Sequence, residues 1–343
     1  MKVTKQVLSP LEKVYAVSFF ALEGRQHVLA ATEEHGPCLL FSPPDWTASI
    51  VWDGPGGTMN LIPLPDRAGE FLAIQNFFPV FQSESAGIVH TAYDRAKHQW
   101  YVTRVLDLPF VHRIEVIQER AGVYLAAGTL CAGKAFRDDW SQPGAVYVGQ
   151  IPRQLADPWQ MTPVLTGLAK NHGLYAAVFH GRQCLLAAGQ EGLFSIQVPT
   201  ESETTWMTRR LIDHEVSDVV AFDLDEDGKP ELVTIEPFHG DILAVYREEN
   251  GRWNKIHEEA ISFGHALWAG RLGNEVGILV GNRGGQKELL WFRVVSGRPF
   301  RVEREVLDSG VGPAQIAVAS ENGKFRIVSA NHGTGQVSLY IKE

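Results

Sequence analysis

Seven positions that each open a short strand-like run recur along the chain at steps of about fifty residues, and four of them carry His or Asp side chains that can bind a metal. The column of seven such positions reads Tyr15, Met59, His112, His172, Asp218, His265 and Ala314. Neutral imidazoles with one carboxylate suit Zn²⁺ or Mn²⁺ better than Ca²⁺ or Mg²⁺. A histidine-rich site with a free coordination position is typical of a catalytic metal, which polarises a carbonyl or activates a bound water. Provided that one fold brings the column together, we predict a divalent transition metal, Zn²⁺ or Mn²⁺, held by His112, His172, His265 and Asp218.

An aromatic residue heads a second recurring run, and its spacing reveals the repeat that positions the column. This run begins at Trp46, Trp100, Trp159, Trp206, Trp253 and Phe300, at steps of 54, 59, 47, 47 and 47 residues. Each period holds four short apolar or alternating runs bounded by Gly, Pro, Asn and Asp, which is the pattern of four β-strands without a helix. Four-stranded units repeated radially form a β-propeller. We therefore predict an all-β, seven-bladed β-propeller of four-stranded blades, in which these tryptophans are packing residues.

The two ends of the chain fit the same architecture. The last unit, from Ala314 to Glu343, contains three strand-like runs and lacks the aromatic-headed fourth, while residues 1–14 supply a matching run. Pairing that first strand with the last unit closes the ring and removes two exposed sheet edges. The sequence thus predicts one propeller domain over residues 1–343, instead of the two domains that length alone suggests. The seven opening positions then surround one central channel.

Loops that join the second and third strands of each blade open on the same face of a propeller as the column, and they add polar side chains. The predicted catalytic set consists of proton carriers and a clamp for a carboxylate or hydroxyl, namely Tyr15, Glu236, His332 and the clamp Arg283. The predicted substrate-binding set is His35, Asn76, His239 and Asn282. The two longest inserts lie between Phe77 and Gly87 and between Cys131 and Gly144, and connections of that length are often functional.

An acidic loop forms a second candidate cation site. Asp223, Asp225, Asp227 and Glu231 stand at positions 1, 3, 5 and 9 of a short loop, and Gly228 permits a sharp turn. Hard oxygen ligands at this spacing suit Ca²⁺, although strands and not helices flank the loop. We predict a structural Ca²⁺ in the 223–231 loop, on the face opposite to the column.

Composition excludes several classes of partner. The chain has 31 Lys and Arg against 40 Asp and Glu, a net charge of −9, so we expect no nucleic-acid partner. Three cysteines far apart, Cys38, Cys131 and Cys184, suggest neither a disulfide framework nor a zinc knuckle. The sequence shows no signal peptide and no apolar stretch of about 20 residues, so no membrane association is expected and a cytoplasmic location is predicted. The oligomeric state stays open.

Two stretches carry a resemblance to known propellers. Asp223–Glu231, followed by Leu232-Val233-Thr234, resembles the FG-GAP/VCBS repeat. The segments Gly264–Ala269 and Asn331–Tyr340 resemble the propeller domain of aldos-2-ulose dehydratases. This resemblance implies metal-assisted elimination of water from a keto-sugar such as 1,5-anhydrofructose. The chain lacks cupin domains, so the isomerase activity of the two-part enzymes is not expected.

The column and the resemblance together predict a metal-dependent carbon–oxygen lyase, a hydro-lyase, that acts on a small keto-sugar or sugar acid at the channel mouth. His112, His172 and His265 hold the cation, and Asp218 is its fourth ligand or a base. Two alternatives remain. One is a non-catalytic propeller that binds a sugar or a partner protein through the same face. The other is a metal-free polysaccharide lyase or glycosidase.

Overall fold

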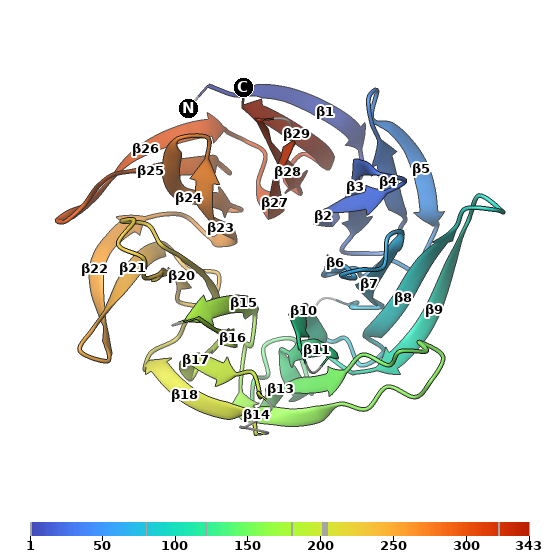
Figure 1. Ribbon diagram of the computed structural model, residues 1–343, viewed down its shortest axis with the longest axis horizontal. Helices are drawn as coiled ribbons and strands as arrows, with labels where there is room; N and C mark the ends of the chain where they lie inside the picture. Colours follow the sequence, from blue (N-terminus) through green and yellow to red (C-terminus); the bar gives the residue numbers. More distant parts are fainter. Residues whose placement is uncertain are drawn as a thin grey trace.

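The fold is a ring of β-sheets around a central axis (Figure 1). The computed structural model describes residues 2–79, 81–120, 122–179, 181–200, 205–321 and 323–342, and within these ranges it contains strands and no helix. Accordingly, no helix in the described ranges is long and apolar enough to span a membrane. Seven antiparallel sheets follow one another in chain order, which confirms the predicted all-β, seven-bladed propeller.

The first three blades contain the two long inserts. Blade 1 consists of β2 (Val14–Leu22), β3 (Arg25–Thr32), β4 (Cys38–Ser42) and β5 (Thr47–Trp52). Blade 2 consists of β6 (Leu61–Pro63), β7 (Glu70–Gln75), β8 (Gly87–Asp94) and β9 (Gln99–Asp107). Blade 3 consists of β10 (Val111–Glu119), β11 (Gly122–Thr129), β13 (Gln142–Gln150) and β14 (Thr162–Leu168), with the short β12 (Cys131–Gly133) paired to β13.

The other four blades repeat the pattern with shorter loops. Blade 4 consists of β15 (Gly173–Phe179), β16 (Arg182–Gly189), β17 (Gly192–Gln197) and β18 (Met207–Ile212). Blade 5 consists of β19 (Asp218–Phe222), β20 (Glu231–Glu236), β21 (Ile242–Glu249) and β22 (Arg252–Ala260). Blade 6 consists of β23 (Gly264–Leu272), β24 (Glu275–Asn282), β25 (Leu289–Gly297) and β26 (Phe300–Asp308). Blade 7 consists of β27 (Pro313–Glu321), β28 (Lys324–Asn331), β29 (Gln336–Lys342) and β1 (Thr4–Pro10).

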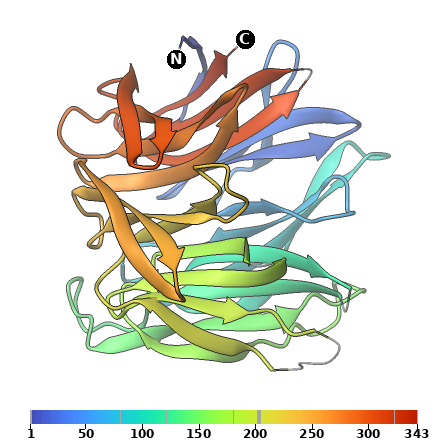
Figure 2. The same cartoon turned by 60° about the vertical axis from the view of Figure 1, so that its left-hand side comes forward.

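The N-terminal strand closes the ring. Strand β1 pairs antiparallel with β29, from Thr4 opposite Ile341 to Pro10 opposite Gln336. The two ends of the chain therefore lie beside each other at the outer edge (Figures 1 and 2). Blade 7 gains its fourth strand from the start of the chain, as its missing aromatic-headed run predicted.

The second strand of each blade is buried on both faces, because its side chains alternate between the two neighbouring blades. In β24, for example, Ile278, Leu279 and Val280 are all fully buried. This environment explains the short continuous apolar runs of the sequence. The aromatic residues of the repeat head the outer strands, where Trp46 and Phe300 are each only 7% exposed. These two are packing residues, as the sequence predicts.

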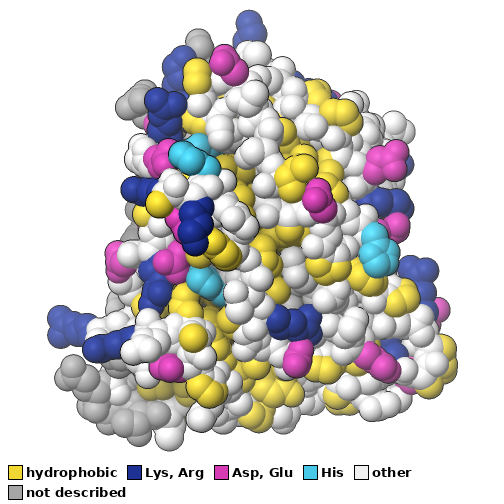
Figure 3. All heavy atoms as spheres, turned by 90° about the vertical axis from the view of Figure 1, so that its right-hand side faces the viewer, with side chains coloured by type: hydrophobic (Ala, Val, Ile, Leu, Met, Phe, Trp, Pro, Cys, Tyr) yellow, Lys and Arg dark blue, Asp and Glu magenta, His cyan; other side chains and the backbone are white. Residues whose placement is uncertain are grey.

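The outer surface is mixed in character. Single apolar side chains such as Ile50 on β5 and Met207 on β18 are exposed there. On the side of the ring that Figure 3 shows, acidic and basic side chains are interspersed with apolar ones. In that view, no one sign of charge covers the surface.

Four inner strands contain a β-bulge at the residue that the sequence placed in the column. The strand register skips Tyr15 in β2, His112 in β10, His265 in β23 and Ala314 in β27. A bulge re-aims the side chain of the extra residue. Strand β19 has no such shift, since Asp218 pairs directly with Ile235. The column positions are therefore not equivalent, because Asp218 takes part in regular strand pairing whereas the four bulged residues do not.

We expect removal of residues 1–10 to destabilise the whole ring instead of trimming a tail. The deletion exposes the edge of β29 and removes the ladder with β1, at about 0.5 to 1.5 kcal/mol for each hydrogen bond lost. Chemical denaturation should show a free energy of unfolding lowered by more than about 3 kcal/mol. The control is Val7→Thr, at a side chain that is 45% exposed, which should change the free energy by less than about 0.5 kcal/mol. Equal stability of the deletion and the control would contradict closure by β1.

Candidate functional site

Three histidines from three successive blades meet at the loop end of the channel. His172 directly precedes β15, His239 lies in the loop between β20 and β21, and His265 is the bulged residue of β23. Each offers one ring nitrogen, and the three nitrogens lie within 4.8 Å of one another. The ring centroid of His172 is 4.8 Å from that of His239 and 5.2 Å from that of His265. We call these three residues the histidine cluster.

The histidine cluster contains buried nitrogens without a hydrogen-bond partner. Both ring nitrogens of His172 and Nε2 of His239 are in this state. Nδ1 of His265 lies 2.7 Å from the carbonyl of Ala314 and donates to it, which leaves the lone pair on Nε2. Leaving a buried polar group unsatisfied costs about 1 to 3 kcal/mol. A ligand that binds several imidazole lone pairs at once removes that cost, and a divalent transition metal is such a ligand.

Burial keeps the histidine cluster in its metal-binding form. Loss of solvation lowers the pKa of His172 and of His265 well below the usual value, and it lowers the pKa of His239 to about 3. The guanidinium of Arg283 adds to this effect at His239 and His265. The imidazoles are therefore neutral at pH 7, as metal coordination requires.

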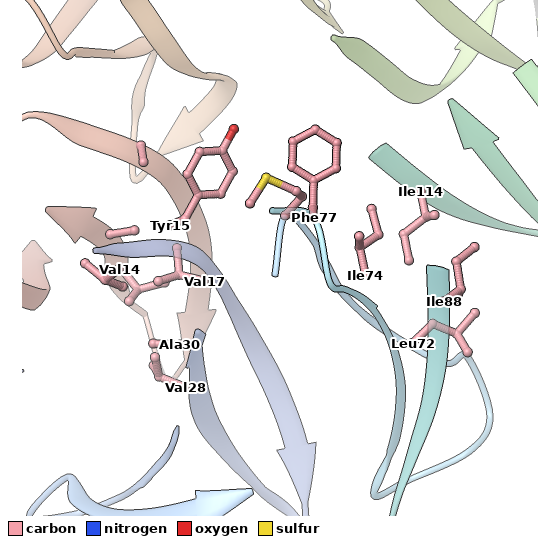
Figure 4. Packing of buried hydrophobic residues seen from close by; sticks show 14 of the residues in the cluster. Val14, Tyr15, Val17, Val28, Ala30, Leu72, Ile74, Phe77, Ile88 and Ile114 are labelled. Carbon is pink, nitrogen blue, oxygen red and sulfur yellow. The ribbon is translucent and has the colours of Figure 1, made fainter. Parts of the chain in front are cut away.

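Tyr15 and His112 flank the histidine cluster. The hydroxyl of Tyr15 is 3.3 Å from Nε2 of His112 and 3.3 Å from Nε2 of His265. Figure 4 shows Tyr15 extending from the inner end of β2 with its hydroxyl toward the centre of the ring, close to Phe77. Burial raises the pKa of Tyr15 to about 12, with Arg113 and Arg283 acting against the increase. The phenol thus stays protonated at neutral pH and is a proton donor.

The column matches the histidine cluster only in part. The predicted ligands His172 and His265 belong to it, whereas His239, predicted as a substrate contact, completes it. His112 packs on His172 with ring centroids 4.6 Å apart but lies outside the group of three. Asp218 is also outside this group, because its unbulged strand directs the carboxylate toward Arg113, 4.0 Å away.

Asp218 nevertheless lines the same cavity as His265. Its carboxylate accepts a hydrogen bond from the backbone amide of Val219. Burial raises its pKa to about 6, and the positive charge of Arg113 opposes the shift. Asp218 also influences the pKa of Tyr15. A carboxyl group whose pKa lies just below neutral pH is mostly ionised at pH 7 and is suited to accept a proton.

A second polar group, the rim network, lies above His265. It consists of Glu33, Arg283 and His332. Nε2 of His332 is 2.7 Å from the carboxylate of Glu33, and the guanidinium of Arg283 is 3.1 Å from Nδ1 of His332 and 3.4 Å from Nε2 of His265. The structure thus brings together the predicted residues Arg283 and His332.

Glu33 was not among the predicted site residues. The repeat contains the signal that identifies it, because Glu33, Arg283 and His332 each follow the last residue of a second strand, in blades 1, 6 and 7. Its pKa is lowered despite its burial, through the hydrogen bond with His332 and the charge of Arg283. Glu33 is therefore an anion that orients both neighbours.

Glu236 is not in the channel. It is the last residue of β20, one position earlier in the repeat than the rim residues, so its side chain points between blades. Its carboxylate accepts hydrogen bonds from Thr234 at 2.6 Å and Tyr246 at 2.8 Å, and it pairs with His214 and Lys255. Blade 7 has the same arrangement at Asn331, which bonds Ser329 and Tyr340. The partners of Glu236 thus come from its own blade and from His214 in the segment before it, and Glu236 is not a member of the histidine cluster.

The remaining predicted substrate contacts are not members of the histidine cluster, although the backbone of Asn282 pairs with Gly264, which directly precedes His265. Asn282 ends β24 at the same repeat position as Glu236 and is buried. His35 packs its ring 4.1 Å from that of Phe78, and its backbone forms a bridge with Gly56. Asn76 bonds the carbonyl of Gly56 through its backbone amide. Both belong to the loops of blades 1 and 2.

The two long inserts converge over the histidine cluster. Phe81 of the first insert and Trp140 of the second have ring centroids 5.8 Å apart, and both pack against Phe238, at 6.1 and 5.7 Å. Phe238 in turn stacks on His239 at 4.0 Å. We call Phe81, Trp140 and Phe238 the aromatic roof. It covers the histidines on the loop face, where His172 is fully buried.

A cavity of about 320 Å³ opens on the other side of the histidine cluster. It extends along the inner strands away from the loops, from His265 to Trp268 on β23 and from Ala314 to Val318 on β27. Its polar lining is Asn60, Arg113, Glu115, Asp218, His265 and Gln315. Burial raises the pKa of Glu115 to about 8, so this carboxyl is largely neutral at pH 7. We call this space the channel cavity.

The acidic loop between β19 and β20 gathers its carboxylates as predicted. Oxygens of Asp223, Asp225 and Glu231 lie within 4.8 Å of one another. Arg247 pairs with Asp225 at 2.8 Å and with Glu231 at 2.9 Å. Arg298, whose side chain is 62% exposed, pairs with Asp225 and with the fourth predicted ligand, Asp227. A cation in this loop therefore competes with two arginines.

Comparisons with known proteins identify the fold alone. No protein-family model matches the sequence, and no curated protein matches it. A chain of the mitotic checkpoint complex crystal structure superposes with a TM-score of 0.63 at 10% identity, over 98% of this chain and 92% of that one. Sqt1 of Saccharomyces cerevisiae gives 0.58 at 10% identity, over 99% and 97%. The PQQ-bound aldose sugar dehydrogenase of Streptomyces coelicolor gives 0.51 at 14% identity, over 99% and 98%.

We expect the native protein to bind one Zn²⁺ per chain through the histidine cluster. Removing a ligand in His172→Ala or His239→Ala should weaken binding by a factor of at least about 100. Because burial lowers the pKa of all three imidazoles, protons compete weakly, and binding should persist below the pH of about 6.5 at which an exposed histidine site begins to protonate. Elemental analysis after dialysis at several pH values measures both effects. The control is the exposed His98→Ala, and equal zinc content in all variants would refute this site.

For the acidic loop, we expect Arg298→Gln to bind Ca²⁺ more tightly than the native chain. The substitution removes a competing charge from Asp225 and Asp227 while leaving the four carboxylates in place. Isothermal titration with Ca²⁺ measures the change. Arg209→Gln, at an exposed arginine whose guanidinium donates to the carbonyl of Gly251, is the matched control and should behave as the native chain does. The absence of Ca²⁺ binding in all three proteins would rule out a calcium loop.

Proposed function

We propose that this protein is a metal-dependent hydro-lyase that eliminates water from a small keto-sugar or sugar acid at the centre of the ring. The histidine cluster carries the proposal, because its unpartnered nitrogens stand beside a protonated phenol and an ionisable carboxylate. The motif resemblance of residues 264–269 and 331–340 to aldos-2-ulose dehydratases supports the choice of substrate. The sugar dehydrogenase among the structural neighbours shares only the fold, and a fold does not define a reaction.

The residues of the histidine cluster fit a Zn²⁺ or Mn²⁺ ion, since three neutral imidazoles leave at least one coordination position free. Such an ion, when bound, polarises a carbonyl or carboxylate oxygen of the substrate. Arg283 lies 3.4 Å from Nε2 of His265 and donates to the same oxygen from the loop face. Glu33 and His332 fix the direction of that guanidinium. Both effects acidify the hydrogen on the neighbouring carbon.

Asp218 is the proposed general base. Its carboxylate lines the channel cavity beside His265 and removes the proton from the carbon next to the polarised group. With a pKa of about 6, it is mostly ionised at pH 7 and still basic enough to accept the proton. Arg113, 4.0 Å away, stabilises the ionised form.

Tyr15 is the proposed general acid. Its hydroxyl lies at the centre of the ring, and its raised pKa keeps the proton available. The phenol protonates the hydroxyl on the adjacent carbon, which leaves as water. One carbon–hydrogen and one carbon–oxygen bond break, a carbon–carbon double bond forms, and the proton taken by Asp218 returns through solvent to Tyr15. His112, which accepts from or donates to the same hydroxyl, holds the phenol in place.

We expect the reaction rate to fall as the pH drops through about 6, because protonation of Asp218 removes the base. Asp218→Asn and Tyr15→Phe should each lower kcat by a factor of about 10² to 10⁴. The ultraviolet absorbance of the unsaturated product measures the rate. Both variants should retain bound zinc, since neither residue belongs to the histidine cluster.

Tyr93→Phe on the outer part of blade 2 is the matched control and should keep native activity. Undiminished turnover after chelation of the metal would favour a metal-free lyase. Sugar binding by the native protein without turnover would favour a binding propeller. Full activity of Asp218→Asn would refute the assignment of the base.

A further inference from the structure

The two sides of the histidine cluster differ in access. On the loop face, the aromatic roof packs on His239 and His172, and Phe77 packs on His112 with ring centroids 5.2 Å apart. On the other side, the channel cavity reaches His265 directly. The channel cavity thus borders the histidine cluster at His265, whereas the aromatic roof packs over His239, which keeps partial exposure on the loop face.

The channel cavity presents hydrogen-bonding groups of several kinds. Arg113 is held rigidly, since its guanidinium donates to the carbonyls of His172 at 3.3 Å and Met59 at 3.4 Å. The side-chain oxygens of Asn60 and Gln315 accept from backbone amides of neighbouring blades, at 2.9 and 2.8 Å, and so fix both amide groups. Their amide nitrogens remain as donors.

Acceptors and flat apolar surface complete the lining. The carboxyl groups of Glu115 and Asp218 stand among these donors, and the rings of Tyr175 and Trp268 form part of the wall. Planar donors and acceptors around aromatic rings are suited to a ligand with many hydroxyls on an apolar ring, which is the chemistry of a carbohydrate. A fatty or purely anionic ligand would leave several of these groups unsatisfied.

We propose that the channel cavity binds a single sugar ring, which enters from the end of the channel opposite to the loops. This rests on the proposed function and narrows it to a monosaccharide-sized substrate. A volume of about 320 Å³ lies at the lower end of the range of about 300 to 1,000 Å³ for small-molecule pockets. The aromatic roof closes the path along which a polysaccharide would extend past the histidine cluster.

Two variants test the proposal, one that fills the cavity and one that makes its lining less polar. Ala317 lines the cavity on β27, and Ala317→Phe should block it. Glu115→Leu keeps the approximate volume of the side chain but replaces its hydrogen-bonding carboxyl group with an apolar one. Titration calorimetry with 1,5-anhydrofructose should show affinity lowered more than tenfold by the first and about fivefold or more by the second. Both variants should retain the zinc content of the native protein, because the histidine cluster is unchanged.

Matched controls carry the same substitutions outside the cavity. Ala96→Phe lies in the exposed turn after β8, and Glu119→Leu lies at the far end of β10, the strand that carries Glu115. Both should bind the sugar as the native chain does. A third comparison removes part of the aromatic roof in Trp140→Ala, which should leave the affinity within about threefold of native.

Native affinity in both Ala317→Phe and Glu115→Leu, or loss of binding in Trp140→Ala alone, would overturn the proposal and place the sugar on the loop face. The absence of sugar binding by the native chain would overturn it as well. A native chain that binds the sugar in the cavity but lacks metal or turnover would refute only the proposed function. The Glu115→Leu arm keeps the test valid should Ala317→Phe fail to fold.

Discussion

A strand in a closed ring of blades gives its side chains alternately to two protein neighbours, and this alternation decides which residues reach the channel. Side chains enter the channel where an inner strand begins or where a bulge breaks the alternation. Tyr15, His112 and His265 stand at such bulges, and His172 directly precedes its strand. The positions of these four residues depend on those interruptions of a regular ladder, whereas His239 and the rim network extend from loops.

The same constraint explains the electrostatics of the site. Imidazoles that leave the ladder at the narrow end of the channel are packed against one another and against aromatic rings, so they lose solvent and stay neutral. Such a group of bases is unfavourable on its own account, because ring nitrogens of His172 and His239 are buried without a hydrogen-bond partner. The surrounding sheets supply the rigidity that holds it, since each histidine comes from a different blade. The site and the fold are therefore linked through packing: a looser ring would allow the histidines to turn toward solvent.

Much of the fold followed from periodicity, because repeated packing demands repeated residue types. The seven opening positions predicted seven blades, the missing aromatic-headed run of the last unit predicted the role of residues 1–14, and the pairing of β1 with β29 agrees. The site was harder to predict from the sequence, since a shift of one residue reverses the direction of a side chain. Glu236 and His332 both lie near strand ends, yet Glu236 ends its strand and points between blades, whereas His332 follows its strand and reaches the rim. No spacing rule distinguishes Asp218 from the bulged histidines, because a bulge is a property of two paired strands.

The pairing of β1 with β29 also has a consequence during synthesis. Thr4 and Ile341 are neighbours in the ladder but almost the full length of the chain apart. Among the strands of this sequence, β1 is synthesised before all others but pairs with β29, which is synthesised after them. Contacts of such high sequence separation form late and slowly. Until β29 is available to pair with β1, the ring is an open arc with two unpaired edges, exposed to association with other chains.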